Sequence, residues 1–126
     1  EVAERENSAI KLEEEASRYD HLTKDSFIIA SLMQNAFMKE SEDLAAMVQS
    51  ELRKSIPSPD RGVKQAGFYV LIGASMPNVL IEVGFLSNPT EEKNLKKASY
   101  RQQIAEAVYG AIFLFKQTKE KLLVKG

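Results

Sequence analysis

The sequence predicts an α/β protein, and the first observation behind this prediction is a pair of short apolar runs. Residues 68–72 and 79–85 are rich in β-branched and aromatic side chains and are bounded by Gly and Pro, as buried strands are. The second observation is helical periodicity on both sides of them, which gives the expected order α, α, β, β, α, α. Because two strands do not make a stable sheet, we expect part of a larger sheet flanked by helices on both faces.

The two runs are joined by the short connection 73–78, whereas a crossover between parallel strands needs about a dozen residues or more. Two arrangements stay open. The runs are antiparallel neighbours, or they are parallel strands separated by another strand that this chain does not contain.

Helices are expected at residues 2–12, 26–53, 89–98 and 99–115. The second of these is long enough that we expect either one rod or a break near residues 39–41. The best-marked start is at Asn88, which caps a helix with Pro89 in its first position and Glu91 in its third. Pro57, Pro59 and Gly62 mark the loop before the first predicted strand.

The size and composition fit a single domain over residues 1–126, with 44% apolar and 28% charged residues. The formal net charge is −1, and no basic patch alternates with aromatic residues, so nucleic acid is not an expected partner. No apolar run approaches the roughly 18 residues of a membrane span. The chain opens on Glu1 rather than Met, which is typical of a processed or excised piece.

Cysteine is absent, which excludes thiolate catalysis, disulfides and cysteine metal sites within this chain. His21 is the single histidine, and a zinc site takes three or four His, Cys or carboxylate ligands. Because its neighbours are polar, His21 is predicted to be a solvated loop residue, and no metal site is expected here.

One carboxylate, Glu82, stands inside the second apolar run. Strand alternation puts Val79, Ile81 and Val83 on one face and Leu80, Glu82 and Gly84 on the other. A buried carboxylate is costly unless it is paired or hydrogen-bonded. The residues alone leave two interpretations open: a Glu at a strand edge capped by a Lys or Arg, or a general acid or base facing a cleft.

Two longer motifs surround Glu82: RGVKQAGFYVL at 61–71 and SMPNVLIEVGFLSNP at 75–89, followed by Glu91, Glu92 and Leu95. In this order they resemble the C-terminal half of the zinc-dependent N-acetylmuramoyl-L-alanine amidases. The segment Arg5 to Ser8 also resembles one that these enzymes carry just after their second metal-ligand histidine.

The resemblance implies a twisted, mostly parallel sheet with helices on both faces. It implies hydrolysis of the amide between N-acetylmuramic acid and the L-alanine of the peptidoglycan stem peptide, in the periplasm or cell envelope, for cell separation. It makes Glu82 the general base. Arg61 and Lys64 are candidates to contact the carboxylates of the stem peptide, although the favoured interpretation is that both are solvated loop bases.

The family holds zinc with two histidines and a glutamate, and none of these three ligands is present in the sequence. His21 lies in the wrong place to replace either histidine. We therefore expect zinc in a longer parent enzyme, with its ligands outside this chain. We expect neither zinc nor amidase activity in the 126-residue chain alone.

Some members that act in cell division carry a regulatory insertion, and residues 10–32 lie where it would sit. Glu13, Glu14 and Glu15 are candidates to block the active site until an activator protein binds near residues 10–37. The alternative to an enzyme is a non-catalytic regulatory or interaction domain, derived from an amidase, that docks through the helices at 26–53 and 99–115.

Overall fold

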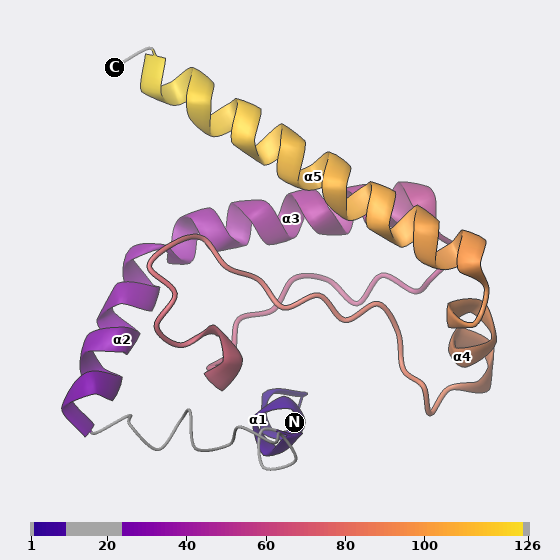
Figure 1. The fold of residues 1–126 in the computed structure, drawn as a ribbon, viewed down its shortest axis with the longest axis horizontal. Helices are drawn as coiled ribbons and strands as arrows, with labels where there is room; N and C mark the ends of the chain where they lie inside the picture. Colours follow the sequence, from indigo (N-terminus) through magenta and orange to yellow (C-terminus); the bar gives the residue numbers. More distant parts are fainter. Residues whose placement is uncertain (1, 10–23, 125–126) are drawn as a thin grey trace. The chain divides into compact units, whose positions relative to one another are not determined.

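The computed structural model describes residues 2–9 and 24–124 (Figure 1). These residues form five α-helices and one turn of 3-10 helix: α1 Val2–Ala9, α2 Lys24–Ala36, α3 Met38–Ser55, η3 Tyr69–Leu71, α4 Pro89–Leu95 and α5 Ala98–Val124. The expected helices are therefore present. The long one breaks at Phe37, whose N–H turns back to the Gln34 carbonyl at 3.2 Å, a little earlier than residues 39–41.

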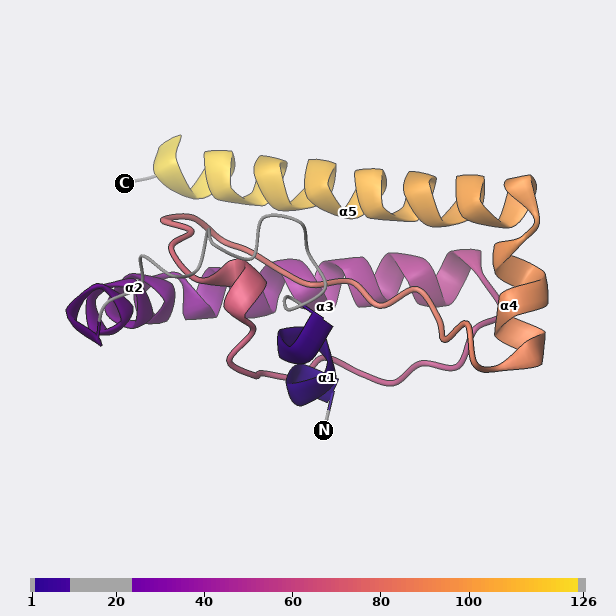
Figure 2. The same ribbon diagram turned by 60° about the horizontal axis from the view of Figure 1, so that its bottom comes forward.

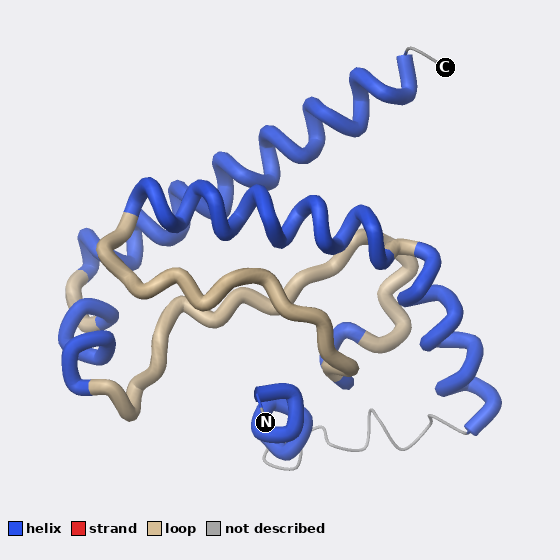
Figure 3. The backbone as a smooth tube through the Cα atoms, turned by 180° about the vertical axis from the view of Figure 1, so that it is seen from behind, coloured by secondary structure: helices blue, strands red, loops and turns tan. Residues whose placement is uncertain are grey.

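The predicted α/β sheet is wrong, because the described part of the chain contains no strand (Figure 3). Residues 68–72 close into η3, where the N–H groups of Leu71 and Ile72 donate to the carbonyls of Phe68 and Tyr69. Residues 79–85 form a segment without helix or ladder bonds. A strand needs a second backbone to pair with, and neither run has such a partner among the residues described.

The described chain divides into two compact units. The first takes its residues from Glu1–Ser41 and Lys64–Asn78, and the second from Glu42–Val63 and Val79–Gly126. The boundary between them falls inside α3. The single domain expected over residues 1–126 stays a prediction.

In the first unit, the side chain of Asn7 on α1 holds the segment that leads into η3. Its amide nitrogen donates to the Gly67 carbonyl at 2.8 Å, and its oxygen accepts from the Tyr69 N–H at 2.9 Å. At the other end of this segment, the N–H of Asn78 donates to the Ser41 hydroxyl at 3.1 Å. Polar side chains therefore fix residues 67–78 at both ends.

The second unit is built on two antiparallel helices, α3 and α5. Its core comprises Val48, Leu52 and Ile56 from α3 and the residue after it, and Tyr100, Ile104, Ala107 and Ala111 from α5. At the far end of the pair, Lys119 lies 3.7 Å from Asp43. Figure 2 shows α5 running back along α3 from the end at which α4 lies.

Helix α4 begins as the sequence predicts. The side-chain oxygen of Asn88 accepts from the N–H groups of Thr90 and Glu91 at 3.0 and 3.2 Å, and Pro89 takes the first helical position. The helix thereby acquires a fixed start immediately after the 79–85 segment.

Among the described residues, no helix is both long and apolar enough to cross a bilayer.

Candidate active site

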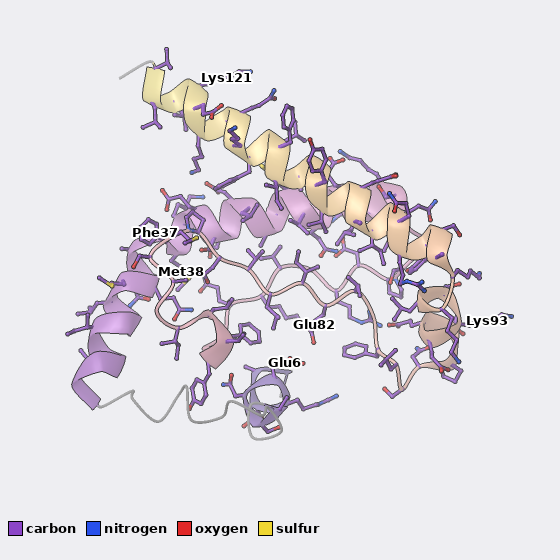
Figure 4. All side chains as sticks on the ribbon, viewed as in Figure 1. Glu6, Phe37, Met38, Glu82, Lys93 and Lys121 are labelled. Carbon is purple, nitrogen blue, oxygen red and sulfur yellow. The ribbon has the colours of Figure 1, made fainter. Side chains whose placement is uncertain are left out.

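The predicted catalytic residue, Glu82, lies in the segment that crosses the second unit beside its core. Ile81 and Val83 pack against the core cluster, while Glu82 between them is exposed. Figure 4 shows its side chain directed away from α3 and α5. The predicted alternation of faces around Glu82 is thus confirmed, although the segment is not a strand.

Among the residues that the structure describes, no base caps Glu82. The described residues supply its carboxylate with no hydrogen-bond or ion-pair partner. The described structure therefore contains no Lys or Arg partner of the kind that the strand-edge interpretation required.

A second carboxylate, Glu91, fixes the backbone just after Glu82. It is 8% exposed and lies in the first turn of α4. Its Oε2 accepts from the Phe85 N–H at 2.7 Å, and its Oε1 accepts from the Arg61 guanidinium at 2.5 Å. The same guanidinium lies 4.8 Å from the centre of the Phe85 ring. One side chain thus joins the Glu82 segment, the 57–63 loop and α4.

Gly84 makes this arrangement possible. Its φ of 149° lies in a region that residues with a Cβ rarely adopt. A Cβ built at this position would lie 3.0 Å from Glu91 Oε2. Gly84 therefore allows the close approach of the Glu91 carboxylate.

Sequence reasoning missed the contact that Glu91 makes. Its third position in α4 suggested only the acid of a helix cap, which reaches back to the N–H of the capping residue. In the structure the Asn88 N–H is already donated to the Phe85 carbonyl at 3.0 Å. Glu91 instead takes the N–H of Phe85. Arg61, the other partner of Glu91, lies 30 residues earlier in the sequence, and no local pattern links the two residues.

The loop that carries Arg61 is itself tied to α3. Asp60 accepts from Gln49 Nε2 at 2.5 Å and from Arg53 Nε at 2.7 Å, and also from the N–H of Gly62 at 2.8 Å. The polar contacts therefore run without interruption from α3, through Asp60 and Arg61, to Glu91.

Both carboxylates of this network are held in the ionised form. The N–H of Phe85, and then Arg61, lower the pKa of Glu91 from its ordinary 4.5 against the opposing effect of burial. The N–H of Gly62 is the largest cause that lowers the pKa of Asp60 from 3.8. Glu91 is therefore a fixed negative charge near neutral pH, suited to accept hydrogen bonds rather than to exchange protons.

Two of the other predicted site residues, Arg61 and Lys64, belong to different units of the structure. Arg61 is 42% exposed but is paired with Glu91, and Lys64 is exposed in the first unit. His21 and the three glutamates 13–15 lie outside the described residues, as does most of the predicted insertion 10–32.

No three His, Cys, Asp or Glu side chains within the described ranges are close enough to hold a metal ion. The described residues therefore do not fit a zinc site. What they offer chemically is one exposed carboxylate on a segment held from both sides, an arrangement that suits a proton-transfer group.

The sequence matches the family described as N-acetylmuramoyl-L-alanine amidase over residues 15–113. The N-acetylmuramoyl-L-alanine amidase AmiA of Escherichia coli K12 is 34% identical over 108 residues, covering 85% of this chain and 37% of that protein. AmiA of Salmonella typhimurium is 32% identical over 115 residues, covering 90% and 39%. The amidase LytC of Bacillus subtilis is 39% identical over 69 residues, covering 55% and 14%.

The chain spans between 14% and 39% of the length of these relatives. No solved structure matches this one significantly. The family match itself extends over far more than half of the 126 residues and includes Glu82 and Glu91. The chain therefore belongs to the N-acetylmuramoyl-L-alanine amidase family.

Proposed function

We propose that this chain works within a peptidoglycan amidase, which hydrolyses the amide between N-acetylmuramic acid and L-alanine, and that Glu82 is its general base. Family membership supports the reaction. The observation that supports the role of Glu82 is its position: an exposed carboxylate between two side chains that pack against the core. The packing of Ile81 and Val83 holds the backbone that carries this carboxylate, while the charge itself is open to a ligand.

The proposed step is a hydrolysis with one proton shuttled by Glu82. The carboxylate takes a proton from a water molecule, whose oxygen bonds to the carbonyl carbon of the muramic acid side chain. The carbon–nitrogen bond then breaks, and Glu82 returns the proton to the departing nitrogen of L-alanine. General acid–base catalysis of this kind contributes about 10²- to 10⁴-fold.

We also propose that a longer parent protein supplies zinc ligands from residues outside this chain. The described residues do not form such a site. When bound, zinc polarises a carbonyl and activates water.

Substrate contacts of Arg61 and Lys64 with the stem-peptide carboxylates stay a prediction. The pairing of Arg61 with Glu91 favours a structural role for Arg61. Lys64, which is exposed, is the better candidate of the two for a peptide contact.

Location and regulation are further proposals: action in the periplasm or cell envelope, during cell division, under an activator that binds near residues 10–37. The exposed apolar side chains of α2 support a partner surface; they are Ile28, Ile29, Leu32 and Met33. If the glutamates at 13–15 block the site, replacing all three with alanine raises the basal activity of the parent enzyme. Unchanged basal activity removes this proposal.

The test of the proposed reaction is product identification. The full-length parent protein, loaded with zinc, is incubated with a purified muropeptide, and the products are identified by mass spectrometry. The proposal expects a free stem peptide beginning with L-alanine and a sugar that ends in intact N-acetylmuramic acid. The same incubation is run with the variant that carries alanine at positions 13, 14 and 15. A muropeptide that neither protein cleaves contradicts the reaction and favours the alternative, a non-catalytic domain that binds a partner or the cell wall.

A further inference from the structure

We infer that Glu91 is a positioning residue for Glu82: it holds the backbone that carries the proposed base, and the rate of the reaction depends on it through Glu82. The inference rests on the proposed function of Glu82. Glu91 itself is buried, and its two carboxylate oxygens bind the Phe85 N–H and the Arg61 guanidinium.

The anchor that Glu91 provides lies close to Glu82 along the chain. Phe85, whose N–H donates to Glu91, is three residues after Glu82, a length of about 10 Å even when fully extended. Ile81 and Val83, the residues directly before and after Glu82, pack against the core of the second unit. The backbone of Glu82 is therefore anchored at its two neighbours and again at Phe85. Without Glu91, the anchor at Phe85 is lost.

Glu91 itself cannot easily move. It lies in the first turn of α4, and Asn88 caps its own N–H. A carboxylate at a helix N-terminus is also favoured by the helix dipole. Its second oxygen is occupied by Arg61, which stacks on the Phe85 ring. Glu91 and Arg61, the two side chains that contact Phe85, thus also hold each other in place.

Gly84 is shaped to this contact. With φ at 149° and its Cβ position 3.0 Å from Glu91 Oε2, only glycine accommodates both the backbone and the carboxylate. The contact between Glu91 and the Phe85 N–H therefore requires a glycine at the preceding position, Gly84.

The neighbouring Glu92 provides the control. It lies on the same turn of α4, but its side chain is 40% exposed and pairs with Lys96 at 2.6 Å, one turn further along the same helix. That pair is not connected to the Glu82 segment. Replacing Glu92 changes charge and helix content as replacing Glu91 does, without releasing Phe85.

The experiment measures kcat and KM of the full-length, zinc-loaded protein on a purified muropeptide. Glu91→Ala should lower kcat about 100-fold, because a misplacement of about 1 Å has that effect, while KM stays within about threefold. The kcat of Glu91→Gln should lie between those of Glu91→Ala and the wild type, since the amide oxygen of Gln can still accept from the Phe85 N–H. Glu92→Ala should stay within about twofold of the wild type. All rates are taken per folded molecule, from circular dichroism and thermal melting.

A double-mutant cycle with Glu82→Gln separates positioning from a merely structural role. If Glu91 acts through Glu82, Glu91→Ala added to Glu82→Gln lowers the residual rate by less than about threefold, so the two losses do not multiply. Losses that multiply fully overturn the inference, as does a wild-type kcat for Glu91→Ala. If Glu91→Ala does not fold, Glu91→Gln and Gly84→Ala complete the same cycle.

The outcomes also distinguish this inference from the function on which it rests. Wild-type activity in Glu82→Gln overturns the proposed general base. Loss of activity in Glu82→Gln together with full activity in Glu91→Ala and Glu91→Gln overturns the positioning role alone.

Discussion

Residues 68–72 and 79–85 look alike in the sequence, since both are short apolar runs bounded by Gly and Pro, and the structure treats them differently. The first closes into η3 and leaves Tyr69 and Val70 exposed, with Val70 at 53%. The second lays Ile81 and Val83 against the core of α3 and α5. Every apolar side chain of the second run is at least partly buried, whereas Tyr69 and Val70 of the first run are exposed.

The anchors of the two runs differ in the same way. Asn7 binds the Gly67 carbonyl and the Tyr69 N–H, the two groups that a neighbouring strand would otherwise pair. Glu91 binds one N–H, that of Phe85, and adds an ion pair with Arg61. The side-chain anchor of the first run is a neutral amide. The second is held by packing together with a charge. We conclude that packing against helices, rather than apolar content, makes a fixed platform for Glu82.

The largest expected effect on stability separates the glycines beside the two runs. Gly84→Ala should destabilise by about 2 kcal/mol, because the new Cβ is strained and meets Glu91. Gly67→Ala meets no atom within 4 Å and has no positive φ, so its free energy of unfolding should change by less than about 0.5 kcal/mol. Urea unfolding of both variants checks the difference, and equal losses would break the comparison.

A slightly smaller effect distinguishes the apolar side chains. Ile81→Ala should cost about 1.5 kcal/mol, less than a fully buried isoleucine, because the side chain is only partly buried against the core. Val70→Ala, at an exposed position, should stay within about 0.5 kcal/mol. Thermal melting of the matched pair tests this. A costly Val70→Ala would mean that the first run is packed as well as the second.

The smallest effect concerns pH, because only one of the two anchors titrates. The pKa of Glu91 is lowered in the folded state, so its contribution is present above its ordinary value of 4.5 and is lost as pH falls through the lowered value. The stability difference between wild type and Glu91→Gln should therefore shrink from pH 7 toward pH 3. The difference between wild type and Asn7→Ala should not change with pH. The urea midpoints of the three proteins between pH 7 and pH 3 measure both stability differences. If the difference between wild type and Glu91→Gln does not change with pH, the role of the charge is contradicted.

The sequence predicted the features that depend on near neighbours. The cap at Asn88, the first helical position of Pro89 and the alternation around Glu82 are all confirmed. The strands were wrong because pairing depends on a second backbone, about which an apolar run carries no information. The Glu91 contact escaped prediction for a related reason: Arg61 and Phe85 meet it only after the 57–63 loop has folded back.

The most direct measurement is the rate of amide cleavage by Glu82→Gln in the full-length, zinc-loaded protein, with bound zinc determined on the same sample. Glu106→Gln is the matched control, since Glu106 is exposed on α5 and accepts a bond from Gln102 at 2.9 Å. The account predicts a loss of about 10³-fold for Glu82→Gln at unchanged zinc content, and a wild-type rate for the control. A Glu82→Gln enzyme that cleaves as fast as Glu106→Gln would contradict it.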